Sequence, residues 1–161
     1  MDARLTALKL FLDELDTPPD IETVDDRKRV QKAVYLGQLS GVDLGYRFGW
    51  YLMGPYSPSL TRDYYTLATE IASGDREYED KELQPSLRTR LRRVHDLLDP
   101  PAEVNLPQER WLELVSSLHY LREITNLNRE KALEKLTQEK PSLVKFADQA
   151  ESMLKEVGLL Q

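Results

Sequence analysis

The sequence predicts a mainly α-helical, compact multi-helix domain with a small β-strand or hairpin element near residues 46–53 and a C-terminal helical subdomain. Three observations lead to this fold class. Apolar residues recur at helical spacing along most of the 161 residues. One aromatic stretch alternates with a period of two instead, which is typical of a strand. A proline-rich segment over 99–107 then separates four expected helices from three more. We therefore expect an N-terminal core over 1–99 and a helical extension over 100–161, packed together as one structural domain.

The first two helices have clear ends. Leucines at helical spacing predict a helix over about residues 2–15, which the following prolines stop. Thr23 with Asp26 three residues later resembles a capping box, so a second helix should begin near Val24. Gly41 and the glycine-containing loop after it end that helix.

The aromatic stretch comes next and predicts the β element. The alternating residues expected to face the core are Tyr46, Phe48, Trp50 and Leu52. Because a lone strand leaves its backbone groups unpaired, it needs a partner, and the expected partner in this chain is the segment 76–83. A Gly-Pro turn should follow the strand.

The remaining chain predicts five helices. Ser57 is a favourable N-cap with Pro58 at the first helical position, and Gly74 closes this third helix. A charged loop over 75–82 should be solvated. The other helices are expected after Pro85, around Trp111, after the capping residue Asn128, and from Pro141 to Val157. The apolar stripe of the last helix either closes the core or forms the seam of a homodimer.

Composition excludes several classes of function. The chain has no cysteine, so disulfides, thiolate metal sites and cysteine nucleophiles are absent. It has neither the apolar core of a secretory leader nor an apolar run that could span a membrane, so we expect a cytoplasmic protein without a membrane partner. The net charge of −6 disfavours nucleic acid as a partner unless the cations gather in one patch.

No catalytic constellation is recognisable. The two histidines, His95 and His119, lie on different expected helices, and a structural role is the better interpretation for both. Catalytic serine, metalloprotease and phosphate-loop motifs are missing. We therefore expect a non-enzymatic protein without cofactor or metal. A hydrolase or nuclease that uses scattered carboxylates with magnesium is the weaker reading.

Two basic clusters support an alternative function. Arg27, Lys28 and Arg29 lie at the start of the second helix, and Arg88 and Arg92 lie on the fourth. If these residues converge on one face, the chain could be a winged-helix-like nucleic-acid-binding regulator with the strand as its wing. A solvated polar face is the simpler interpretation of the second cluster.

Two motifs carry a resemblance to a known family. Arg27-Lys-Arg-Val-Gln-Lys-Ala-Val-Tyr35 is followed by Phe48-Gly-Trp-Tyr-Leu-Met-Gly-Pro-Tyr-Ser-Pro-Ser-Leu60. This order resembles the YwgA-like group and, more distantly, the SocA-like or Panacea antitoxin domain, in which a K-L-Q-K helix precedes an aromatic strand and a G-P-Y-S turn. The match covers about residues 24–72. Arg29-Val-Gln-Lys32 departs mildly from K-L-Q-K, and the helices after Pro107 have no counterpart.

The resemblance implies a small bacterial protein from a defence or mobile locus, such as a phage-defence locus, that acts by binding another protein. Our leading prediction is a protein-interaction module, antitoxin-like or adaptor-like, with a toxin or other defence component as its partner. On these terms the junction of helix, strand and turn would be the binding region. Tyrosine and arginine are also enriched in interfaces. The binding candidates are Lys32, Tyr35, Arg47, Tyr51, Tyr56, Ser57 and Arg62.

Overall fold

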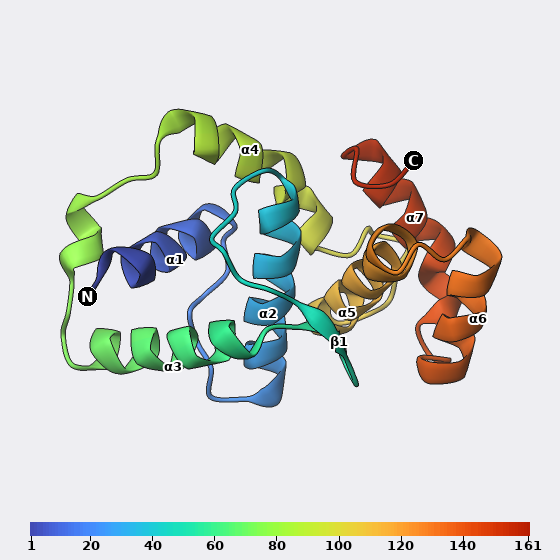
Figure 1. Ribbon diagram of the computed structural model, residues 1–161, viewed down its shortest axis with the longest axis horizontal. Coiled ribbons are helices and arrows are strands. Elements are labelled where there is room, and N and C mark those ends of the chain that lie inside the picture. The colour runs from blue at the N-terminus through green and yellow to red at the C-terminus, as the bar shows by residue number, and fades with distance from the viewer.

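The computed structural model describes all 161 residues and confirms the mainly α-helical fold class. It contains seven α-helices and one two-stranded antiparallel hairpin (Figure 1). The helices are α1 (Ala3–Glu14), α2 (Val24–Leu39), α3 (Pro58–Ala72), α4 (Pro85–His95), α5 (Gln108–His119), α6 (Arg129–Glu139) and α7 (Ala147–Glu156). None of these helices combines the length and the apolar character needed to cross a bilayer.

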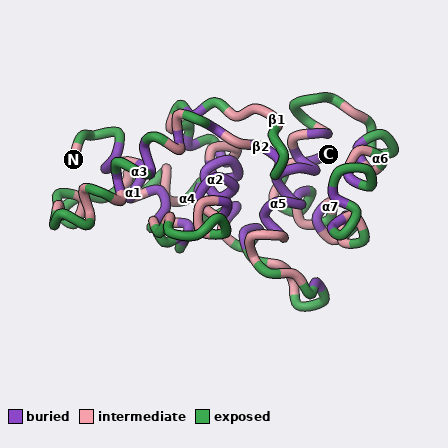
Figure 2. The backbone as a smooth tube through the Cα atoms, turned by 90° about the horizontal axis from the view of Figure 1, so that it is seen from below, coloured by how far each residue is buried: buried purple, intermediate pink, exposed green.

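Helices α2 and α5 form the centre of the molecule. Helices α1, α3 and α4 surround α2 on the N-terminal side, whereas α6 and α7 lie beyond α5 (Figure 1). Many of the residues along α2 and α5 are buried (Figure 2). A single hydrophobic core of 32 buried residues runs through both halves. Trp111 of α5 is fully buried in it and donates its indole N–H to the Leu97 carbonyl at 2.9 Å. The core is therefore continuous across the proline-rich segment 99–107.

Local capping explains where several helices begin. Thr23 and Asp26 form the expected capping box at α2. Ser57 caps α3 with Pro58 at its first position, and Asn128 caps α6. Asp2 caps α1 by accepting a hydrogen bond from the Leu5 N–H. Each cap satisfies a backbone N–H group that a helix start leaves without an internal partner.

The small β element is present as predicted, but its pairing partner and its turn differ from the prediction. Its strands are β1 (Gly49–Tyr51) and β2 (Gly54–Tyr56), so the partner of the aromatic strand is the adjacent segment. Residues 76–83 instead include a 3₁₀ turn, Glu77–Asp80, whose charged side chains are solvated. The tight turn is Leu52-Met53, not Gly54-Pro55. Pro55 lies opposite Trp50, a position of the antiparallel ladder at which its missing N–H is not needed.

The aromatic residues partly follow the expected pattern. Tyr46 is buried, and Phe48 packs edge-on against Tyr35 of α2 with ring centroids 5.3 Å apart. Trp50 packs against Tyr120, beyond the end of α5, at 5.6 Å. Leu52 was expected in the core, but it is 88% exposed because it lies at the hairpin turn.

The last helix begins later than predicted. Pro141 starts a turn, in which the Leu143 N–H donates to the Lys140 carbonyl, and a short 3₁₀ segment follows over Val144–Phe146. Helix α7 begins only at Ala147. This turn directs Lys140 back toward α5, where its ammonium group is buried.

Candidate functional site

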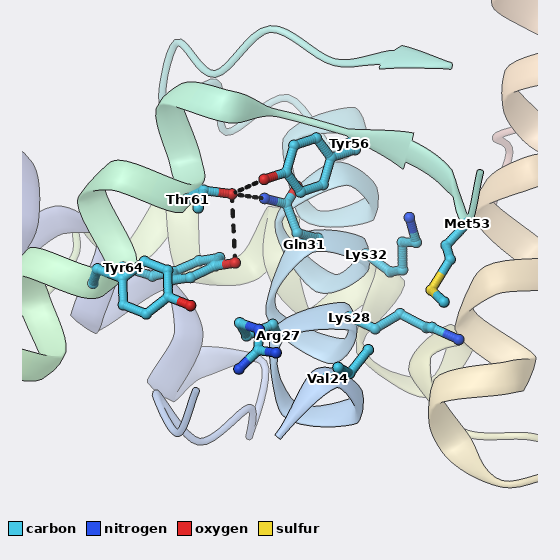
Figure 3. Close-up of a pocket in the computed structure, with 10 residues that line it drawn as sticks. Val24, Arg27, Lys28, Gln31, Lys32, Met53, Tyr56, Thr61 and Tyr64 are labelled. Carbon is cyan, nitrogen blue, oxygen red and sulfur yellow. Dashed lines mark hydrogen bonds between the residues drawn. The ribbon is translucent and has the colours of Figure 1, made fainter. Parts of the chain in front are cut away.

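A cleft lies between the first turns of α2, the hairpin and the start of α3 (Figure 3). Its volume is about 220 Å³. The side chains that line it are mainly cationic, amide, hydroxyl and aromatic groups, and they come from three elements that meet only in the folded chain. The lining residues are Val24, Arg27, Lys28, Gln31, Lys32, Met53, Tyr56, Thr61, Tyr64 and Tyr65.

Gln31 joins the wall of the cleft to the hairpin. Its side-chain oxygen accepts the Ser57 N–H at 2.9 Å, and its amide nitrogen donates to the Ser57 carbonyl at 3.0 Å. The same nitrogen donates to Thr61 Oγ1 at 3.0 Å, which also bonds the Tyr56 hydroxyl at 2.5 Å (Figure 3). Because both backbone groups of Ser57 are held by one buried amide, the end of β2 and the start of α3 are fixed on α2.

A buried ion network supports the floor of the cleft. Glu113 of α5 accepts Lys28 Nζ at 2.9 Å and Lys140 Nζ at 2.7 Å. Lys140 also donates to the Leu52 carbonyl at 2.9 Å, and Lys32 donates to the Pro55 carbonyl at 2.5 Å. Two lysines therefore hold the backbone of the hairpin from below. Such charge-assisted hydrogen bonds are stronger than neutral ones.

The pKa values reflect this network. Burial alone would raise the pKa of Glu113, but hydrogen bonds from Lys140 and Lys28, together with their charges, hold the pKa of this carboxyl below its usual value. Burial lowers the pKa of Lys32 to about 7; the charge of Glu113 opposes this shift, whereas those of Lys140 and Lys28 add to it. Lys32 is 2% exposed and forms no ion pair. The cost of removing its ammonium group from water is therefore only partly offset by the more distant charge of Glu113.

The cleft is cationic although the protein is acidic. None of its lining residues is Asp or Glu, while Arg27, Lys28 and Lys32 all face it. Arg27 donates only to the backbone carbonyls of Ile21 and Glu22, at 2.9 and 3.3 Å. In a chain of net charge −6, this concentration of positive charge without a lining carboxylate is the main electrostatic feature of the site.

The rim of the cleft is apolar. Of the six large hydrophobic residues that are exposed, five lie at or beside the cleft, and only Ile124 lies elsewhere. Tyr51 is 49% exposed and its ring packs edge-on against Tyr56, with centroids 5.1 Å apart. We call this set the apolar rim; its members are Val24, Tyr51, Leu52, Met53 and Tyr65.

The predicted protein-binding residues are only partly brought together. Lys32 and Tyr56 line the cleft, and Tyr51 belongs to the apolar rim. Ser57 is fully buried and serves as a cap. Tyr35 is also buried, and its hydroxyl bonds His119 Nδ1 at 2.7 Å.

Arg47 and Arg62 lie apart from the cleft. Arg47 is exposed and lines a different hollow, beside Phe48 and Ile124. Arg62 is exposed on α3 and does not line the cleft. The predicted set therefore divides among the cleft, the core and separate parts of the surface.

Several residues of the site were missed by sequence reasoning. Leu52 was assigned to the core-facing side of a strand, so its exposure at the turn was not expected. The roles of Glu113 and Lys140 depend on contacts across 85 and 27 residues, for which the sequence holds no local signal. Gln31 could have been noticed, because it lies in the motif that carries the family resemblance.

The basic residues of the alternative function do not converge. Arg29 pairs with Asp26 and Glu109, and Lys28 with Glu113. Arg88 and Arg92 both pair with Glu14, at 3.1 and 2.9 Å.

Two further arginines of α4, Arg90 and Arg93, donate to the carbonyls of Gly41 and Ser40 just beyond the carboxyl end of α2. Arg90 and Arg93 thus contact the chain about 17–21 Å along the axis of α2 from the cluster Arg27–Arg29 near its start.

The two histidines occupy contrasting sites. Burial lowers the pKa of His119 to about 4, and its partner is the Tyr35 hydroxyl. The pKa of His95 is raised by hydrogen bonds to Asp96 and Asp16. The chain contains no group of three or more His, Cys, Asp or Glu side chains placed to hold a metal ion.

Comparison of the chain with family models, curated proteins and solved structures gives no match. The function is therefore inferred from the cleft and its rim.

Proposed function

We propose that this protein is a non-enzymatic protein-interaction module, antitoxin-like or adaptor-like, which binds its partner through the hairpin turn and the cleft below it. One observation carries the proposal: of the six exposed large hydrophobic side chains, three line a single cleft and two more belong to the hairpin beside it. Scattered surface hydrophobics need no explanation, but a contiguous apolar patch with a polar centre is typical of an interface.

The geometry of the rim favours a partner of macromolecular size. Leu52 stands at the hairpin turn, 88% exposed, and Met53 of the turn and Tyr65 of α3 both line the cleft. Exposed leucine and tyrosine side chains provide large apolar area to a binding surface, and tyrosine loses little conformational entropy when it is buried.

The proposed binding face, which comprises the hairpin turn and the cleft, is also held rigidly. This lowers the loss of conformational entropy on binding. Lys32 and Lys140 each hold a hairpin carbonyl, and Gln31 holds both backbone groups of Ser57. The hairpin should therefore present Leu52 in one orientation.

The family resemblance agrees with this location. The motif 48–60 forms the hairpin and the start of α3, and Lys32 of the helical motif contacts it. On this basis we propose a bacterial defence or mobile locus as the setting and a toxin or defence component as the partner.

The test is a quantitative pull-down from the native host with the tagged protein and two matched variants. Leu52→Glu places a charge at the hairpin turn beside the cleft, and Ile124→Glu places the same charge at the exposed hydrophobic residue outside the proposed face. We expect Leu52→Glu to reduce recovery of the partner by roughly 10-fold or more, about 1.4 kcal/mol, while Ile124→Glu leaves it unchanged.

Both variants should keep the melting temperature of the wild-type protein, because both positions are solvated. If Leu52→Glu recovers the partner as well as the wild-type protein does, the interface lies elsewhere. The same conclusion would follow if both variants lose the partner equally.

A further inference from the structure

We propose that the partner inserts the carboxylate of an Asp or Glu side chain into the cleft, between Arg27 and Lys32, while apolar residues beside it contact the rim. This inference rests on the proposed function, and it adds the chemistry of the partner's anchor residue. It follows from the charges that face the cleft, from their unused hydrogen-bond donors and from the size of the cleft.

The charges around the cleft are unbalanced. Lys28, Lys140 and Arg110 share the single carboxylate of Glu113, which lies below the cleft. Neither Arg27 nor Lys32 has a carboxylate within ion-pair distance, and no acidic side chain lines the cavity. A negative group entering the cleft would therefore meet two cations that have no acidic partner in the chain.

Donors for such a group are free. Arg27 uses only Nη1, on two backbone carbonyls, so Nε and Nη2 remain available for a carboxylate. Lys32 uses one of its three N–H groups, on the Pro55 carbonyl. Both side chains line the cleft from α2, five residues or about 1.4 turns apart. In Figure 3 Lys32 lies on the hairpin side of the cleft, whereas Arg27 lies nearer the start of the helix. Planar carboxylates match the guanidinium fork well.

The size of the cleft selects a side chain over a small-molecule ligand. Pockets for drug-sized ligands usually measure about 300–1,000 Å³. This cleft has about 220 Å³ and an open mouth surrounded by Val24, Met53 and Tyr65. A carboxylate with a short apolar stem fits this volume, and hydrophobic neighbours in the partner's sequence would cover the rim.

Lys32 adds a dependence on pH. The charged groups near it are Lys28 on its own helix, Glu113 of α5 and Lys140 after α6, and the group it contacts on β2 is the Pro55 carbonyl. With its pKa near 7, Lys32 loses its charge as the pH rises above neutrality. A bound carboxylate favours the charged form, so binding takes up a proton above pH 7 and weakens as the pH rises.

The experiment uses the full-length protein and displayed random 12-residue peptides. Peptides that bind the wild-type protein but not the Leu52→Glu variant are kept and sequenced. Each is then synthesised in two versions, one as selected and one in which its Asp or Glu is replaced by Asn or Gln. Titration calorimetry then measures wild type, Arg27→Gln and the matched control Arg90→Gln. Like Arg27, Arg90 donates to a backbone carbonyl, but it lies at the far end of α2.

We expect the selected peptides to share one acidic residue flanked by apolar residues. Changing that residue to the amide should weaken binding to wild type and to Arg90→Gln by roughly 10-fold or more, and binding to Arg27→Gln by less than about 3-fold. A second variant, Lys32→Met, should remove most of the loss of affinity between pH 6.5 and pH 8.5.

The outcomes separate the two proposals. Peptides that depend on Leu52 but show no acidic preference, or whose amide versions bind equally well, would overturn the carboxylate anchor and leave the binding face intact. If no selected peptide depends on Leu52, the binding face itself is wrong. Acetate that competes with the acidic peptides at millimolar concentration would support a carboxylate site in the cleft.

Discussion

Among single residues, Lys32 is a buried lysine whose charge is unfavourable in the folded state. Its ammonium group is buried beside two other lysines, and burial lowers its pKa from 10.5 to about 7. The unfolded chain therefore binds more protons than the folded chain between about pH 7 and pH 10, and stability should rise with pH across this window. Below pH 7 the destabilising contribution is fully present.

We expect Lys32→Met to remove this dependence. Between pH 7 and pH 9.5 the free energy of unfolding of the wild type should rise by roughly 3 kcal/mol relative to that of the variant. Urea unfolding at both pH values measures the difference. If the free energy of unfolding changes equally with pH in the two proteins, Lys32 does not have the lowered pKa that its burial implies.

The two histidines should titrate far apart. His119 is buried with its Nδ1 bonded to Tyr35, and its pKa is lowered to about 4; its contribution to stability is complete above pH 6.5 and is lost as the pH falls. His95 has a raised pKa, so its contribution is present below pH 6.5 and is lost as the pH rises through its folded value.

Nuclear magnetic resonance of the imidazole protons can follow both histidines, with His95→Gln to assign the signals. We expect one to titrate above pH 6.5 and the other to remain neutral until close to pH 4. Two titrations near pH 6.5 would contradict the buried Tyr35–His119 pair.

At the scale of elements, the hairpin depends on one glycine. Gly54 has a φ of +90°, and a Cβ at this position would lie 2.5 Å from the buried Ser117 Oγ of α5. Gly74 has a similar φ of +95°, but a Cβ there would meet no atom within 4 Å. Comparing an alanine substitution at each position therefore distinguishes the effect of backbone strain alone from the added effect of steric overlap with α5.

We expect Gly74→Ala to lower the free energy of unfolding by about 1 kcal/mol, and Gly54→Ala by about 3 kcal/mol. Adding Ser117→Ala to Gly54→Ala should recover part of the difference, because it removes the atom in contact. Thermal unfolding of the four proteins measures these values. Equal losses for the two glycines would show that β2 can move away from α5.

At the scale of the whole molecule, the two expected parts depend on each other. Helix α5, which begins after the proline-rich segment, packs along α2 and provides the carboxylate that neutralises Lys28. Without α5 the apolar face of α2 would be exposed and Lys28 would lose its partner.

We therefore expect a fragment of residues 1–106 to lack cooperative thermal unfolding, measured by circular dichroism, whereas the full chain unfolds in one transition. A fragment with its own sharp transition and dispersed amide signals would establish a domain boundary near residue 100.

The helical class and most helix starts could be predicted from the sequence alone. Thr23, Ser57 and Asn128 cap the helices that follow them, and such signals act over three or four residues. The sequence also located the chemically distinctive segment, because aromatic residues and Gly-Pro concentrate around residue 50.

The partner of β1, the exposure of Leu52 and the composition of the cleft became visible only in the folded chain. These features depend on which segments meet, and the ion pair between Lys28 and Glu113 joins residues 85 positions apart. Periodicity and capping report a residue's neighbours along the chain, whereas burial and charge balance depend on neighbours in space. For this reason Lys32 could be predicted as a binding candidate, but its lack of an acidic partner could not.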